Sequence, residues 1–366
     1  MPAFCFIVGA DADIDKTMTF VFFLAMTATL TAGESTTADD AAYRKWLSER
    51  VEVAIARSDA ESLALAVGLS EHRCKSDITC FPNTEWAALD ARARESRRPA
   101  TLALLANVAA MRHEESSSRW QRVAQLDPNN AYPLLLQAGA LWRAGEHSRA
   151  LDILSKAATL DRYDDYFSTA VAAIKIAVEG NPPPVEHLNR CTRELLPEHA
   201  GQVEVDNAVI FAIAADVGLP PSLGDFIKLC RQEGDAFDAA RASLCAAAGR
   251  QMHAHATSLL SSSFGLALQR FSTRDEAEKE RISAQQRTES ERLYAQLWWT
   301  DVAEPEVRAR AASYWIRELS EHGELAAGEA LVRQFGPVPE TAEQTATRHG
   351  KYIEKARHCY LGDHDS

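Results

Sequence analysis

Cysteine is the residue type whose number and spacing best indicate covalent chemistry in this chain. Six cysteines follow residue 32, at Cys74, Cys80, Cys191, Cys230, Cys245 and Cys359. An even number of cysteines in an oxidising compartment indicates disulfide bonds. We therefore expect three bridges, which are Cys74–Cys80, Cys230–Cys245 and Cys191–Cys359.

The expected Cys230–Cys245 bridge places a condition on the turn between its two cysteines. Cys230 lies about one helical turn before Gly234, whereas Cys245 lies about three turns after it. The two thiols can lie side by side on neighbouring helices only if the turn between them extends toward Asp238. Pairing of Cys191 with either of them is the alternative. A further interpretation is that all six cysteines are separate buried thiols in a reducing compartment, where free cysteine packs like a small apolar residue.

Other residue types with chemical potential lack the spacing that catalysis or metal binding needs. The sequence has no H-E-x-x-H, no phosphate-binding glycine loop, no G-x-S-x-G and no C-x-x-C. His253 and His255 are two residues apart on an expected helix, so they point to different faces and cannot share a metal ion. Trp298 and Trp299 are interpreted as packing residues rather than a ligand platform. We predict no cofactor, no metal and no catalysis.

Composition indicates a folded protein whose negative net charge disfavours binding to polyanions. Hydrophobic residues make up 46% of the 366 residues, charged residues make up 25%, and the net charge is −13. Nucleic acid and anionic membranes attract basic surfaces, so neither is an expected partner.

The first 32 residues are predicted to be a secretory signal peptide. An apolar core spans Phe20–Met26, Lys16 precedes it, and Ala32 is the expected cleavage point. Acidic residues before Lys16 disagree with a signal and suggest a later start at Met18. A buried or anchoring N-terminal helix is the alternative, although the apolar run is short for a bilayer span. The predicted location is periplasmic or secreted, with no stable membrane span after signal removal.

Almost every later segment has the pattern of a helix, and one sequence mark repeats. Leu126-Asp127-Pro128 recurs 34 residues later as Leu160-Asp161-Arg162. Small residues at Ala140 and Ala150 would let two helices approach closely, and Gly145 would end the first of them. No run of alternating β-branched residues indicates a strand.

This 34-residue unit resembles the helix–turn–helix of the tetratricopeptide repeat family. The match is good over 131–164 and fair over 97–130, and it fails in the third unit, where three prolines begin at Pro182. The expected fold is all-α, with stacked antiparallel hairpins of a TPR-like α-solenoid followed by a less regular helical region. An ordinary helical hairpin with the same spacing by chance is the alternative.

The expected domain organisation has four parts. The signal peptide (1–32) is followed by an N-terminal helical pair with a cysteine-containing loop (33–83), TPR-like repeats (84–198) and a C-terminal α-helical region (199–366).

The resemblance implies a concave binding face on the repeats. Its positions in this sequence are Tyr132, Leu135, Trp142 and Arg143, extended by Tyr166 and Thr169 in the next unit. Packing against the next helix is an equal interpretation for Leu135 and Trp142. The Lys and Asn that clamp a terminal carboxylate in some family members are missing here. We therefore expect an exported scaffold that binds another protein or peptide segment of the cell envelope. The alternative is an accessory domain or an α-helical hydrolase of the envelope.

Overall fold

The computed structural model describes residues 38–74, 83–112, 114–178, 181, 196, 200–218, 221–231 and 238–361. These ranges form seventeen helices and contain no β-strand, so the predicted all-α class is confirmed. None of the described helices combines the length and the apolar character that crossing a bilayer requires.

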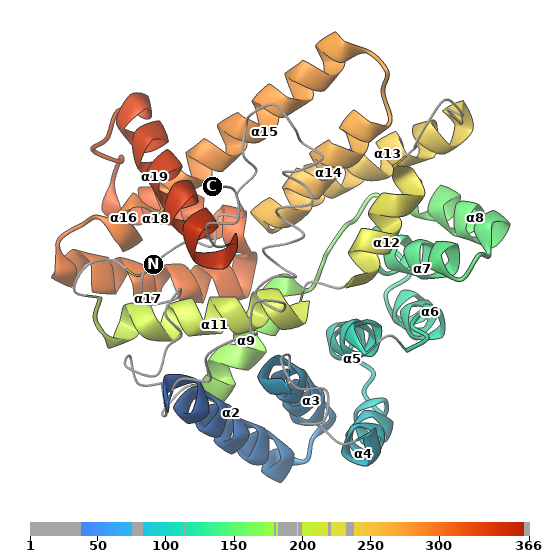
Figure 1. The fold of residues 1–366 in the computed structure, drawn as a ribbon, viewed down its shortest axis with the longest axis horizontal. Helices are drawn as coiled ribbons and strands as arrows, with labels where there is room; N and C mark the ends of the chain where they lie inside the picture. Colours follow the sequence, from blue (N-terminus) through green and yellow to red (C-terminus); the bar gives the residue numbers. More distant parts are fainter. Residues whose placement is uncertain are drawn as a thin grey trace.

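The first half of the chain is a series of consecutive helices that runs around one side of the molecule (Figure 1). They are α2 (Ala38–Arg57), α3 (Ala60–Cys74), α4 (Asn83–Ala93), α5 (Pro99–Met111), α6 (Ser117–Leu126), α7 (Ala131–Arg143), α8 (His147–Ala157) and α9 (Phe167–Val178). From α2 to α8 each helix packs against the next one in sequence. Short connections force such neighbours to run antiparallel.

The second half returns over the first. Its helices are α11 (Gln202–Gly218), α12 (Pro221–Cys230), α13 (Ala239–His255), α14 (Leu259–Phe271), α15 (Glu276–Gln296), α16 (Trp298–Asp301), α17 (Pro305–His322), α18 (Glu324–Phe335) and α19 (Ala342–Leu361). Helix α12 packs along α7, and both α11 and α17 pack against α9. The predicted ranges 84–198 and 199–366 therefore share buried apolar clusters in the described structure.

Local sequence explains where α7 begins and ends. The Asn130 side chain caps its first turn, because Oδ1 accepts a hydrogen bond from Tyr132 N at 3.1 Å. Gly145 follows the helix with φ of +80°, a conformation that glycine adopts without strain. The predicted end of this helix at Gly145 is thus confirmed.

The two sequence marks that are 34 residues apart lie side by side. Ala131 N donates to Arg162 O at 2.8 Å, and Arg162 Nη1 lies 2.6 Å from Asp127 Oδ1. The loop that precedes α7 is therefore joined to the loop that precedes α9.

Candidate docking site

Three of the six predicted binding residues lie in the core. Tyr132, Leu135 and Tyr166 are only 2%, 1% and 8% exposed. The Tyr132 ring makes edge contacts with Trp120, Tyr163 and Tyr166 at centroid distances of 5.7, 5.6 and 5.9 Å. Tyr132 therefore fills the core and does not lie on an open concave face as predicted, because its ring is at the centre of an aromatic cluster.

Helix α12 covers the side of α7 that was expected to bind a partner. The residues of α12 that are buried include Leu223, Phe226, Ile227 and Cys230. Their spacing of i, i+3, i+4 and i+7 puts them on one face of the helix. Helix α12 packs along α7 (Figure 1), and the buried apolar residues of both helices belong to one core cluster.

Two predicted binding residues remain at the surface, at the C-terminal end of α7. The half-buried Trp142 ring stacks on His147 with centroids 4.0 Å apart. The Arg241 guanidinium lies 5.4 Å from the Trp142 ring centroid, within cation–π range. Arg143 follows directly, with a side chain that is 37% exposed. We call Trp142, Arg143, His147 and Arg241 the Trp142 patch.

The sixth predicted residue lies elsewhere. Thr169 is exposed on α9 and is not part of the Trp142 patch.

An ion pair joins this patch to α12. Arg143 Nη1 lies 2.9 Å from Asp225 Oδ2, and Lys228 Nζ lies 3.7 Å from Asp225 Oδ1. Burial raises the pKa of Asp225 above its ordinary value, although the charges of Arg143 and Lys228 act to lower it. The ion pair thus holds the Arg143 side chain of α7 against α12, and the side chains of Arg143 and Lys228 remain partly exposed.

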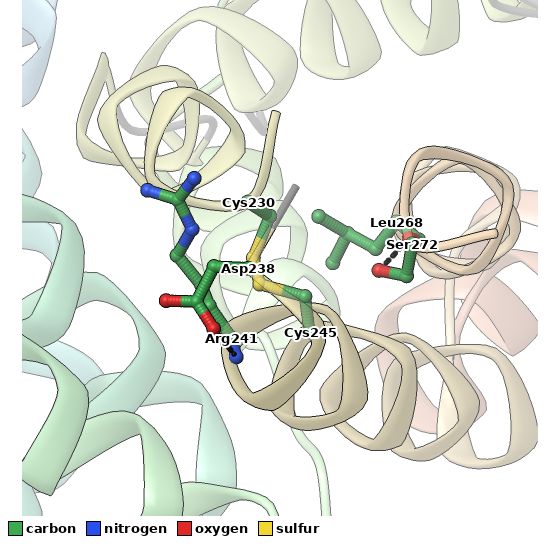
Figure 2. Close-up of a disulfide and its surroundings, with 6 residues drawn as sticks. All are labelled: Cys230, Asp238, Arg241, Cys245, Leu268 and Ser272. Atoms are coloured by element: carbon green, nitrogen blue, oxygen red, sulfur yellow. Dashed lines mark hydrogen bonds between the residues drawn. A yellow bond between two sulfur atoms is a disulfide. The ribbon is translucent and has the colours of Figure 1, made fainter. Parts of the chain in front are cut away.

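A disulfide fixes the helix that carries Arg241. Cys230 at the end of α12 is bonded to Cys245 on α13, with Cα atoms 5.6 Å apart (Figure 2). Asp238 caps α13 by accepting a hydrogen bond from Arg241 N at 3.0 Å. Helix α13 therefore begins directly after Asp238, the residue to which the connecting turn was expected to extend. The predicted Cys230–Cys245 pairing is confirmed, and it rules out Cys191 as the partner of either cysteine.

The other two predicted bridges cannot be compared with the structure. Cys80 and Cys191 lie outside the described residues, and the side chains of Cys74 and Cys359 are also not described. Both bridges stay predictions.

A serine, a histidine and a glutamate meet between α13, α14 and α15. Ser262 Oγ donates to Glu289 Oε2 at 2.9 Å and lies 3.0 Å from His253 Nδ1. Gln285 Nε2 lies 2.9 Å from His253 Nε2. His253 Nε2 also lies 3.5 Å from Glu289 Oε1. The imidazole and the buried Ser262 hydroxyl therefore belong to a polar network that joins α13, α14 and α15.

Sequence reasoning missed His147, Arg241 and Asp225. The signal for Asp225 was the apolar spacing of residues 223–230, which marks a helix buried on one face. Nothing local indicates that Arg241 reaches Trp142, because α13 and α7 meet only in the folded chain.

Comparison with known proteins found no match. No protein family, no curated protein and no solved structure matches this chain. In the described ranges, no group of three His, Cys, Asp or Glu side chains is arranged to hold a metal ion.

Proposed function

We propose that this chain is an exported helical-repeat scaffold that docks a segment of another envelope protein through the Trp142 patch and performs no catalysis of its own. The observation that carries the proposal is the partly exposed Trp142 ring at the end of α7, which stacks on the His147 ring and lies within cation–π range of the Arg241 guanidinium. Tryptophan and arginine are the side chains that most often dominate binding energy at protein interfaces.

The patch is held in place before any partner arrives. Arg143 is paired with Asp225, and Arg241 lies one helical turn before the disulfide-bonded Cys245. A receptor whose side chains are already ordered loses little entropy on binding. The cost of association then falls mainly on the partner segment.

The packing of α5 to α8 supports a repeat-like scaffold. These helices pack in sequence order, and the loops before α7 and α9 are hydrogen-bonded at the 34-residue spacing. Such hairpins are rigid supports for a binding surface. Because α12 covers α7, the proposed surface is the exposed end of α7 and not its inner face.

The test is capture of a partner from the protein's own cell envelope, followed by affinity measurement with the purified partner. Arg241→Ala should weaken binding at least about tenfold, as expected for an arginine at the centre of an interface. Arg317→Ala is the matched control, because Arg317 lies 4.7 Å from the Tyr314 ring in a similar cation–π contact away from the patch. Equal affinity of both variants and the wild type would place docking elsewhere, and loss of binding in both would indicate an indirect effect.

Export has its own measurement. N-terminal sequencing of the mature protein should give a start near Gly33, after the expected cleavage point at Ala32. An intact Met1 or Met18 in cytoplasmic protein would contradict export.

A further inference from the structure

Three distant segments meet at the N-terminus of α14 around two buried carboxyl groups. Asp165 comes from the loop before α9, Glu324 is the first residue of α18, and Ser258 is the N-cap of α14. Both acids are buried, and Glu324 is only 1% exposed. We call Asp165, Thr257, Ser258, Ser261 and Glu324 the acid junction.

Asp165 has a full set of hydrogen-bond donors. Its Oδ1 accepts from Thr257 Oγ1 and from Phe167 N, each at 3.1 Å. Its Oδ2 accepts from Ser258 Oγ at 3.0 Å and from Ser261 Oγ at 2.5 Å. Burial raises the pKa of Asp165 above its ordinary value, although these hydrogen bonds act to lower it. Because Asp165 has more donors than Glu324, it is the better position for the negative charge of the pair.

The Glu324 carboxyl group accepts fewer hydrogen bonds than Asp165 does. Its Oε2 accepts one hydrogen bond, from Leu259 N at 2.8 Å. Its Oε1 is buried and has no hydrogen-bond partner among the described residues. An ionised carboxylate in this position would leave one oxygen with neither solvent nor a donor, which is costly. The geometry therefore favours a proton on Glu324.

The charged and titratable groups that act on the junction do not neutralise a second negative charge. The charged side chain that acts on Glu324 is Asp165, and the one that acts on Asp165 is Asp164. Asp164 is itself paired with Arg162 at 2.8 Å. Tyr132 and Tyr163 adjoin Asp165, and burial raises the pKa of both phenols well above the ordinary value, so they stay neutral. The α14 N-terminus carries only about half a positive charge, which does not neutralise two carboxylates.

The backbone keeps α18 close to α14. Leu325 N donates to Thr257 O at 3.2 Å. Gly323 has φ of +86°, and a Cβ there would lie 2.6 Å from Thr257 Cβ. A residue with a Cβ would be strained at this φ and would clash with Thr257, so glycine allows the close approach of α18 to α14.

We propose that the acid junction is a proton-dependent clasp, which holds α14 and α18 against the loop before α9 while Glu324 is protonated and loosens when Glu324 ionises. The clasp joins the N-terminal hairpins to the C-terminal helices, because its three parts come from both halves of the chain. Its dependence on pH comes from the single proton on the Glu324 carboxyl group.

The pH window follows from the direction of the shift. Burial raises the pKa of Glu324 from 4.5 to about 7, and the charge of Asp165 acts in the same direction. A carboxyl group with a raised pKa in the folded state stabilises the fold fully below its unfolded pKa, and this contribution is lost as pH rises through the folded pKa. The stabilising contribution of the Glu324 proton is thus complete below about pH 4.5 and is lost as pH rises through about 7.

The experiment compares melting temperatures of the full chain between pH 5 and pH 8. The wild type should lose stability over this range, and Glu324→Gln should lose less by several degrees, because glutamine keeps the acceptor for Leu259 N and cannot ionise. Glu329→Gln is the control, since Glu329 lies exposed on the same helix and the substitution should leave the pH dependence of the wild type unchanged. The same pH dependence in wild type and Glu324→Gln would overturn the proposal.

Two further measurements keep the test decisive if Glu324→Gln fails to fold. Carboxyl titration of the wild type by NMR should show Glu324 with a midpoint near 7, and a midpoint near 4.5 would overturn the proposal. Amide exchange, corrected for its intrinsic pH dependence, should show that Leu259 and Leu325 lose protection between pH 6 and pH 8. Unchanged protection at both amides would show that ionisation does not open the clasp.

Discussion

The Asn130 side chain and the Asp164 backbone hold each other by two reciprocal hydrogen bonds. Asn130 Nδ2 donates to Asp164 O at 2.9 Å, and Asp164 N donates to Asn130 Oδ1 at 2.9 Å. The same Asn130 side chain caps α7 and also donates to Asp127 Oδ2 at 3.1 Å. One buried amide thus starts a helix and fixes the loop that leads to the next one.

Replacement of Asn130 by Ala should destabilise the protein by about 3 kcal/mol, because it removes a helix cap and the two part-buried hydrogen bonds to the Asp164 backbone. Urea unfolding measures the loss. Asn129→Ala is the matched control, since the neighbouring Asn129 is exposed, and its effect should be within about 0.5 kcal/mol. Equal effects at the two positions would contradict the role given to Asn130.

Tyr132 and Arg143 should respond differently to truncation, although both were predicted as binding residues on the same face. Tyr132→Ala should cost about 3–5 kcal/mol, because it opens a cavity among three aromatic rings. Arg143→Ala should cost about 1 kcal/mol or less, since the ion pair with Asp225 is partly exposed. Thermal denaturation of the two single variants separates these values, and a Tyr132→Ala protein of wild-type stability would contradict the buried position.

Gly265 should not tolerate a side chain. A Cβ at Gly265 would lie 2.6 Å from both Gly249 O and His253 N, which are backbone atoms of the crossing helix α13. Gly265→Ala should therefore cost about 1–3 kcal/mol or more through overpacking.

Gly350→Ala is the control for Gly265→Ala. Gly350 lies in α19, and a Cβ there meets nothing within 4 Å. Alanine is the better helix former, so this change should stabilise the protein by about 0.5–1 kcal/mol. Calorimetry of the two variants should show shifts of opposite sign, and two shifts of the same sign would refute the close contact between α13 and α14.

Loss of the Cys230–Cys245 bridge should cost about 3 kcal/mol, given its sequence separation of 15 residues. Unfolding of the Cys230→Ser/Cys245→Ser variant should match that of the reduced wild type. Non-reducing peptide mapping of protein from an oxidising compartment should show this bridge, and the same map tests Cys74–Cys80 and Cys191–Cys359. Free thiols at Cys230 and Cys245 in that sample would contradict the bridge.

Local sequence was sufficient for the elements that depend on nearby residues. Asn130, Gly145 and the repeated Leu-Asp marks predict the loops around α7, because caps and left-handed turns are set by the residues at the helix ends. The Cys230–Cys245 pairing was one of the pairings that the sequence left open, and the structure brings these two cysteines together. The all-helical class follows from the same local patterns.

Contacts between distant segments were decided only by the tertiary structure. Residue spacing on α7 identifies two faces but not which of them α12 will cover, so Tyr132 and Leu135 could not be distinguished from surface residues. The same holds for Trp142 with Arg241, and for Asp165 near Glu324, which come from helices and loops far apart in the chain. Burial and the electrostatic effect of neighbouring charges depend on every segment packed around a group. A single stretch of sequence therefore determines where a helix begins and ends, and the complete fold determines what that helix contacts.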